Sequence, residues 1–263
     1  MQKDGPIGFF DSGVGGTSIW KEVQRLLPYE STIYLADSKN APYGGRGNSE
    51  IEELSIKNTE LLLSKNCKLI VVACNTATTN AIGKLRNLYP LPFIGIEPAI
   101  KPAALFSGTK VVGILATRGT LSSSLFHETM RLHSNGVQII EQVGDGLVPL
   151  IESGKVSGDE MKVLLARYVK PMLKANIDYL VLGCTHYPYL IPVLKKLLPE
   201  NVKIIDSGAA VARQTRFILQ KHGLVSNSQT TGSHLFYSNK DLNVLNSFLQ
   251  DFSGDYKAEF LDF

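Results

Sequence analysis

The chain has 263 residues, of which 44% are hydrophobic and 19% are charged, a composition typical of a folded globular protein rather than a disordered one. Its formal net charge is +3, and its lysines and arginines are scattered, so the sequence indicates no nucleic-acid partner. The sequence has no apolar stretch of membrane-spanning length, no signal-peptide core at its start and only three cysteines, so we expect a cytoplasmic protein with no membrane contact and no disulfide framework.

The first part of the chain alternates short apolar runs with helical patterns. Strands are predicted over residues 6–10, 32–36, 69–73 and 93–96, and helices over residues 17–27, 50–65 and the stretch after Cys74. Ser49 followed by Glu52 resembles a capping box for the second helix. The run 69–73 is apolar and partly β-branched, which is typical of a strand buried on both faces of a parallel sheet, and it ends at Cys74.

The same pattern begins again after Glu97. Strands are predicted over residues 110–115, 137–142, 202–205 and the apolar run that ends at Cys184, and helices over residues 122–134, 159–175 and 190–198. Residues 144–152 form a loop or a short helix in this interpretation. Asp11 and Asp37 are 26 positions apart, as are Thr117 and Val143, and each half has a cysteine after its third strand. The chain therefore contains an internal β-α-β-α-β-α-β repeat.

The repeat predicts an α/β fold of two similar, mostly parallel-sheet lobes related by pseudo-symmetry, with the active site in the cleft between them. Residues 207–263 do not repeat. They carry predicted helices over 209–221 and 240–252 and strands over 233–237 and 256–261. A separate tail of this size would have little core, so we expect it to join the first lobe. The predicted domains are residues 1–97 plus 207–263, and residues 98–206.

Two cysteines at strand ends of facing lobes would place thiols on opposite sides of a bound small molecule. A thiol has an ordinary pKa of roughly 8.5, and a helix N-terminus or a nearby proton acceptor favours its thiolate. One sulfur of the pair Cys74 and Cys184 could then remove a proton from a carbon while the other donates one from the opposite face. This is a stereoinversion, and no electron-sink cofactor is evident for it.

Each thiol needs a partner that accepts or holds its proton. The candidates are Asp11 for Cys74, and His186 with Glu152 for Cys184, because histidine titrates nearest neutrality. Structural roles compete with these assignments: Asp11 as a helix cap or turn residue, His186 as a loop histidine, and Glu152 as a solvated side chain.

Small polar residues gather in the loops that follow the predicted strands. Their hydroxyl, amide and backbone N–H groups suit a substrate carboxylate, although each alone also fits turn chemistry. These residues are Ser12, Tyr43, Gly44, Asn75, Thr76, Thr117, Thr120 and Thr185.

Other kinds of site fit less well. The run Gly13–Gly16 lacks the Gly-Lys-Ser/Thr of a phosphate loop. Cys74 with Cys184 and His186 lacks the paired spacing of a zinc site, so we predict no metal. Cys67 precedes a strand and is interpreted as structural. A Cys–His nucleophile for acyl transfer remains an alternative, but it leaves the second cysteine unexplained.

Four motifs together resemble the cofactor-independent glutamate racemases, and the resemblance covers nearly the whole chain in order: Asp11-Ser12-Gly13-Val14-Gly15-Gly16, Pro42-Tyr43-Gly44, Cys74-Asn75-Thr76-Ala77-Thr78 and Cys184-Thr185-His186-Tyr187-Pro188. By match to that family, Cys74 and Cys184 are the acid/base pair, with Asp11, His186 and Glu152 beside them. The family's substrate contacts fall on Asp11, Ser12, Tyr43, Gly44, Asn75, Thr76, Thr117, Thr120 and Thr185.

The resemblance implies glutamate as the substrate, a supply of D-glutamate for bacterial peptidoglycan, and a homodimer. Related aspartate racemases tend to carry His where this chain has Thr78 and lack His186-Tyr187-Pro188, which favours glutamate. The chain shows no N-terminal extension of the kind found in relatives with a cell-wall-precursor activator site, so we expect no such activation. A related racemase, a single-cysteine hydrolase and a non-catalytic amino-acid-binding protein remain the alternatives.

Overall fold

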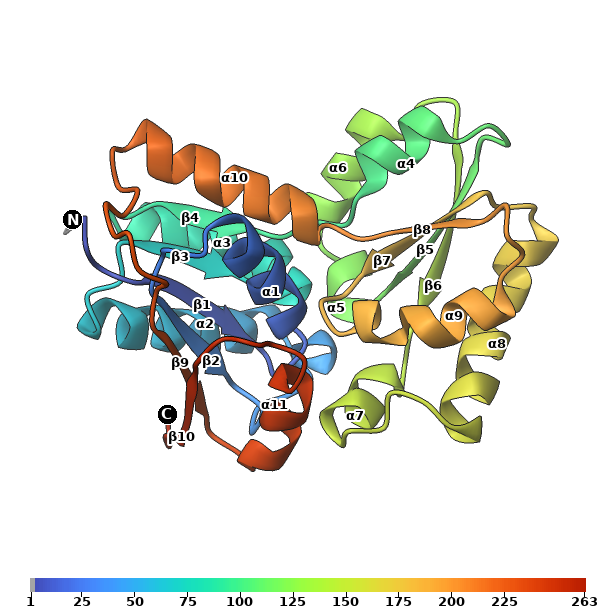
Figure 1. The fold of residues 1–263 in the computed structure, drawn as a ribbon. Helices are drawn as coiled ribbons and strands as arrows, with labels where there is room; N and C mark the ends of the chain where they lie inside the picture. Colours follow the sequence, from blue (N-terminus) through green and yellow to red (C-terminus); the bar gives the residue numbers. More distant parts are fainter. Residues whose placement is uncertain (1–2) are drawn as a thin grey trace.

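The computed structural model describes residues 3–263 and shows two α/β lobes that lie side by side (Figure 1). Strands and helices alternate through the first lobe as β1 (Ile7–Asp11), α1 (Thr17–Leu26), β2 (Thr32–Ala36), the 3₁₀ turn η1 (Tyr43–Gly45), α2 (Asn48–Ser64), β3 (Leu69–Val72), α3 (Asn75–Leu88) and β4 (Phe93–Gly95). The last part of the chain packs on the same lobe as α10 (Gly208–Lys221), β9 (His234–Ser238), α11 (Leu242–Leu249) and β10 (Lys257–Phe260).

The second lobe is continuous in sequence. Its elements are α4 (Ile100–Phe106), β5 (Val111–Ala116), α5 (Arg118–Leu121), α6 (Ser124–His133), β6 (Gln138–Val143), α7 (Leu147–Glu152), α8 (Asp159–Lys174), β7 (Tyr179–Gly183), the 3₁₀ turn η2 (Tyr187–Leu190), α9 (Ile191–Leu197) and β8 (Lys203–Ile205). The chain crosses between the lobes after β4 and again after β8 (Figure 1).

The two sheets confirm the predicted fold class and its repeat. The first sheet has the strand order β10-β9-β2-β1-β3-β4, and the second has the order β6-β5-β7-β8. Removing β10 and β9 leaves β2-β1-β3-β4, which has the same topology as the second sheet, and every strand pair is parallel. The sequence order of the strands therefore places β3 and β7, the strands that precede Cys74 and Cys184, at equivalent positions.

Burial explains why the sequences of β3 and β7 are continuously apolar. All residues of β3 and β7 are buried, because helices cover both faces of the sheets. The largest apolar cluster continues from one lobe into the other and includes Val14 and Trp20 of the first lobe and Ile151 and Tyr187 of the second. The lobes are thus packed against each other through side chains near the strand ends.

The prediction was wrong in local details. The helix α4 was missed, because its seven residues include Pro102 and show only one buried turn, formed by Ile100, Ala103 and Ala104. The helix predicted over 122–134 is confirmed as α6, whose start is capped by the Ser123 side chain accepting from the Phe126 N–H, but the short helix α5 before it was missed. The capping box was also wrong: α2 begins at Asn48, and its N-cap Gly47 has no capping side chain.

Two features of the described chain bear on its class. Among residues 3–263, none of the helices is both long enough and apolar enough to cross a bilayer. The same residues contain no group of three or more His, Cys, Asp and Glu side chains placed to hold a metal ion.

Candidate active site

Cys74 and Cys184 line one small cavity between the lobes, with an empty volume of about 230 Å³. The carboxyl ends of parallel strands are where open α/β sheets bind ligands, and each cysteine follows such an end. Loop and helix-start residues of both lobes complete the lining: Ser12, Pro42, Tyr43, Gly44, Asn75, Thr76, Thr117, Val148, Thr185 and His186. None of these lining residues is a lysine or an arginine.

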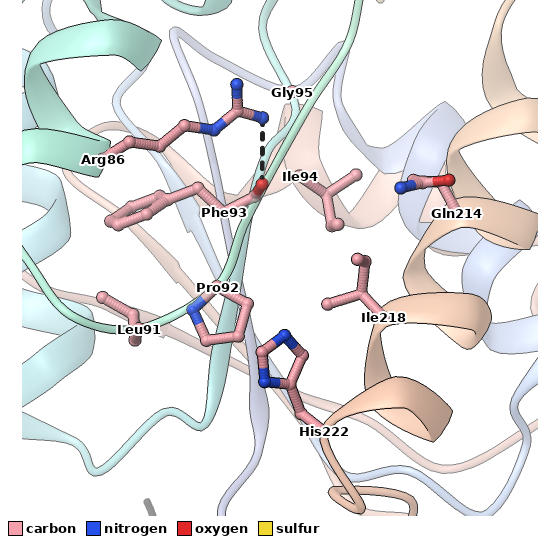
Figure 2. Close-up of a pocket in the computed structure, with 9 residues that line it drawn as sticks. All are labelled: Arg86, Leu91, Pro92, Phe93, Ile94, Gly95, Gln214, Ile218 and His222. Carbon is pink, nitrogen blue, oxygen red and sulfur yellow. Dashed lines mark hydrogen bonds between the residues drawn. The ribbon is translucent and has the colours of Figure 1, made fainter.

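A larger open groove lies elsewhere in the first lobe, between the edge strand β4 and α10 (Figure 2). Its walls are mostly apolar, and the Arg86 guanidinium donates to the Phe93 carbonyl at 3.2 Å. It contains neither of the cysteines nor any other residue of the cavity between the lobes. The chemistry expected from the sequence therefore belongs to the smaller cavity.

Cys74 is the N-cap of α3. Its sulfur accepts from the Ala77 N–H at 3.4 Å and lies 3.7 Å from the Ser12 hydroxyl oxygen. Burial and then the charge of Asp11 raise the pKa of the Cys74 thiol well above its ordinary value, and the hydrogen bonds from Ala77 and Ser12 offset only part of this. The helix N-terminus expected from the sequence is present, but burial outweighs it, so Cys74 rests as a thiol.

Asp11 ends β1 and is completely buried behind Cys74. Its Oδ2 accepts from the Gly16 N–H at 2.8 Å, and its Oδ1 accepts from the Thr185 hydroxyl of the other lobe at 3.4 Å. Burial raises the pKa of Asp11 to about 6, although the charge of His186 and the Gly16 N–H oppose the shift. A carboxyl group that titrates near neutrality can accept a proton from, or return one to, a neighbouring thiol.

Cys184 has a different partner. His186 is buried, and its Nδ1 lies 3.7 Å from the Cys184 sulfur, while its Nε2 lies 2.6 Å from Glu152 Oε1. Nε2 faces both the Glu152 carboxylate and the Gly15 N–H, which lies 3.2 Å away, while Nδ1 faces the thiol. The order Glu152–His186–Cys184 therefore forms a relay that ends at the cavity.

The relay favours charge separation on this side of the site. Burial lowers the pKa of His186, but the contacts with Cys184 and Glu152 more than reverse this and raise it well above its ordinary value. The pKa of Glu152 is lowered, because its bonds to His186, Val14 and Ser38 outweigh burial. Both shifts favour a charged pair of His186 and Glu152 beside Cys184.

The glycines that follow Asp11 permit this relay to approach the first lobe. A Cβ at Gly13 would overlap the Glu152 carboxylate, and a Cβ at Gly15 would overlap the His186 ring. The Val14 N–H donates to Glu152 Oε1 at 2.7 Å across the lobe boundary. The run Gly13–Gly16 thus serves a close contact between lobes and not a bound phosphate.

The remaining predicted residues divide into two groups. Ser12, Tyr43, Gly44, Asn75, Thr76, Thr117 and Thr185 line the cavity together with both cysteines and His186, whereas Asp11, Glu152 and Thr120 lie behind them. Thr120 Oγ1 is 3.0 Å from Thr117 Oγ1, which in turn is 2.8 Å from Thr76 Oγ1, so the three hydroxyls form one cluster across the lobes.

The sequence interpretation missed several residues at the site. Val148 lines the cavity, as does Pro42, which belongs to a quoted motif but was not named as a contact, and Ser38 donates to Glu152 Oε2 at 2.9 Å. Ser38 follows the end of β2, so the rule that polar residues at strand ends form sites identifies it as a candidate. Val148 is an apolar helix residue and carries no signal of this kind.

Comparison with known proteins gives a consistent result. Residues 16–215 match the sequence model of the family described as Asp/Glu/Hydantoin racemase. The chain is 46% identical to a glutamate racemase of Herpetosiphon aurantiacus over 231 residues, which cover 88% of this chain and 91% of that protein.

Two solved structures have the same fold over their full length. One is an Escherichia coli glutamate racemase in complex with L-glutamate and the activator UDP-MurNAc-Ala, with a TM-score of 0.85, 34% identity and 98% of each chain covered. The other is a Francisella tularensis glutamate racemase in complex with D-glutamate, with a TM-score of 0.85, 27% identity, and 99% of this chain and 98% of that chain covered.

Proposed function

This chain belongs to the glutamate racemases of the Asp/Glu/Hydantoin racemase family, and we propose that Cys74 and Cys184 perform its reaction as an acid/base pair on opposite faces of the substrate. It is an isomerase that interconverts L-glutamate and D-glutamate. The observation that carries the proposed mechanism is that both thiols line one cavity, each beside a buried titratable side chain.

Racemisation moves two protons and forms no covalent bond to the protein. The Cys184 thiolate removes the α-proton, the Cα–H electron pair stays on the substrate as a carbanion, and the Cys74 thiol donates a proton to the other face. The inverted product then leaves behind a Cys74 thiolate and a Cys184 thiol. This state performs the reverse reaction, and Asp11 and His186 exchange protons with the thiols to reset it. The two thiols supply both the acid and the base, so the mechanism uses no cofactor.

Neutral groups bind the substrate in this proposal. Ser12, Thr76 and Thr185 line the cavity, and their hydroxyls suit the two carboxylates of the substrate. Asn75 is buried in the lining, and its Oδ1 has no hydrogen-bond partner among the described residues. We assign this oxygen to the substrate ammonium, because a buried acceptor without a donor is costly.

The biological setting follows from the family. We propose that the enzyme works in the bacterial cytoplasm, supplies D-glutamate for peptidoglycan and forms a homodimer. Sedimentation velocity at micromolar concentration tests the last point, and a single species at the 28.8 kDa mass of the chain would contradict it. We also propose residues 1–97 plus 207–263 and residues 98–206 as the two domains, since each set contains one sheet.

Incubation with L-glutamate in deuterated water tests the reaction. The expected product is D-glutamate with deuterium at the α-carbon, because the proton removed and the proton delivered come from different groups. Absence of exchange with both enantiomers would contradict the proposal. A single-cysteine hydrolase, the main rival, requires only one of the two thiols and gives no exchange at the α-carbon.

A further inference from the structure

We propose that Asp37 is a positioning residue that holds the substrate-binding turn Tyr43–Gly45 in place, an inference that rests on the proposed function. Asp37 follows the last residue of β2, and its side chain is only 1% exposed. It forms none of the ion pairs found among residues 3–263. A buried carboxylate without a cation is retained only where hydrogen-bond donors satisfy its oxygens.

Three side chains supply these donors. Tyr43 donates its hydroxyl to Asp37 Oδ2 at 2.5 Å, while Asn40 and Asn239 donate to Oδ1 at 2.8 and 2.5 Å. Asn40 and Tyr43 belong to the loop that carries the turn, and Asn239 follows β9 in the last part of the chain. Asp37 therefore ties the substrate loop to the rigid sheet from two sides.

Tyr43 is held in one orientation by this arrangement. Its hydroxyl donates to Asp37 and accepts from Asn58 of α2 at 3.1 Å, so both of its hydrogen-bonding roles are used. Burial and the charge of Asp37 raise the pKa of Tyr43 well above its ordinary value, so the hydroxyl keeps the proton that it donates.

The other end of the turn reaches the second lobe. Pro42, Tyr43 and Gly44 line the substrate cavity, and a Cβ at Gly44 would come within 2.7 Å of the Thr117 Cβ. The turn is thus enclosed between Asp37 in one lobe and Thr117 in the other. Asp37 itself does not line the cavity, so it acts on the substrate only through the turn.

A carboxylate suits this position better than an amide. Three donors converge on the two oxygens of Asp37, and asparagine presents one oxygen and one NH₂ group. In Asp37→Asn, at least one of the three donors faces another donor, and the loop loses part of its anchor. Alanine removes the anchor altogether.

Kinetics and calorimetry of four variants test the inference. We expect Asp37→Ala and Tyr43→Phe each to raise KM and the calorimetric Kd for glutamate about tenfold, while kcat falls by no more than about threefold, because the thiols and their partners stay on their own strand ends. Asp37→Asn should give an intermediate KM. In the double variant KM should rise by less than the product of the two single increases, because both changes remove the contact between Tyr43 and Asp37.

Glu30→Gln is the matched control. Glu30 is a buried carboxylate just before the other end of β2, where it pairs with Lys68 at 2.6 Å, far from the lining of the cavity. We expect Glu30→Gln to lower the melting temperature and leave KM unchanged. Equal increases of KM in Glu30→Gln and Asp37→Ala at equal loss of stability would overturn the positioning role.

The outcomes separate this inference from the proposed function. A wild type that racemises, combined with an unchanged KM in Asp37→Ala, overturns only the inference. If Asp37→Ala does not fold, an unchanged KM in Tyr43→Phe overturns the inference instead. A wild type that binds glutamate without racemising it overturns the proposed function, and the calorimetric Kd then still decides the role of Asp37. A wild type that does neither overturns both.

Discussion

The two halves of the active site occupy equivalent places in the two sheets but use different chemistry. On one side Cys74 lies beside Asp11 and Ser12, and on the other Cys184 lies beside the His186–Glu152 pair. On the first side burial raises the pKa of the Cys74 thiol and brings the pKa of Asp11 to about 6, and on the second the contacts with Cys184 and Glu152 raise the pKa of His186 in spite of its burial. The fold repeats, but the proton partners do not.

This difference explains how a symmetric architecture performs an asymmetric task. Racemisation needs an acid and a base at the same moment. Two identical half-sites would therefore have to adopt different protonation states each time a substrate binds. In the proposed mechanism the two sides differ before the substrate binds, because the pKa of the Cys74 thiol is raised on one side and the pKa of His186 is raised on the other. The enantiomers have equal free energies, so kcat/KM must remain equal in the two directions. The asymmetry of the site can appear only in kcat and KM taken separately.

The largest expected effect concerns the thiols themselves. We expect Cys74→Ser and Cys184→Ser each to reduce racemisation by about 10³-fold, a loss of about 4 kcal/mol, because serine is far too weak an acid and base at neutral pH. Each variant should still exchange the α-proton of one enantiomer in deuterated water, and the two variants should exchange opposite enantiomers. Cys67→Ser, which changes a cysteine outside the cavity, is the control. Full activity in either catalytic variant would remove the two-thiol mechanism.

The second effect is a gain in stability on the Cys74 side. The pKa of Asp11 is raised from 3.8 to about 6 in the folded protein, so folding favours its protonated form and stability is lost as the pH rises between these values. Asp11→Asn removes this penalty, and we expect it to increase the free energy of unfolding by up to about 3 kcal/mol above pH 6, with no gain below about pH 4. Its racemase activity should fall at the same time.

Denaturant unfolding at several pH values measures the change. Asp178→Asn is a control of opposite sign, because hydrogen bonds from Ser107 and the Gly108 and Thr109 N–H groups lower the pKa of that carboxyl group. It should destabilise the protein at neutral pH. A loss of stability in Asp11→Asn at pH 7 would show that Asp11 is ionised and paired in the folded state.

A smaller effect is expected on the Cys184 side. Glu152→Gln keeps the shape of the side chain but removes the charge that holds the His186 proton, so the pKa of His186 should fall. The alkaline limb of the pH–kcat profile should then move to lower pH, and kcat should fall about tenfold. Glu160→Gln, at an exposed residue paired with Lys155, should leave the profile unchanged. If the alkaline limb does not move in Glu152→Gln, the titration of His186 is not its cause.

The smallest effect concerns Ser12. Its oxygen lies 3.7 Å from the Cys74 sulfur, which is a weak contact, so Ser12→Ala should lower kcat only about threefold. Steady-state rates in both directions measure this change. A loss as large as that in Glu152→Gln would mean that Ser12 is as important on the Cys74 side as Glu152 is on the Cys184 side.

The local pattern of apolar and polar residues in the sequence predicted most of the fold and most of the cavity lining. The apolar runs before Cys74 and Cys184 predict buried parallel strands, and their repetition predicts two lobes of one topology, because strand burial and period depend on neighbouring residues. The motifs at the strand ends supply ten of the residues that line the cavity. The start of α2 was not predictable in this way, since its N-cap is Gly47 with no capping side chain and not the Ser49 that the pattern favoured.

Only the tertiary structure shows which side chains lie beside each thiol and how deeply they are buried. Glu152 reaches Val14 and Ser38 across the lobe boundary, and Asp37 reaches the substrate turn through Tyr43. The helix start at Cys74 alone predicts a thiolate, yet burial beside Asp11 holds it as a thiol. Burial and the distance between charges depend on segments far apart in the chain, so the sequence determined the two thiols and their fold, and the packing of the lobes determined the surroundings of each thiol.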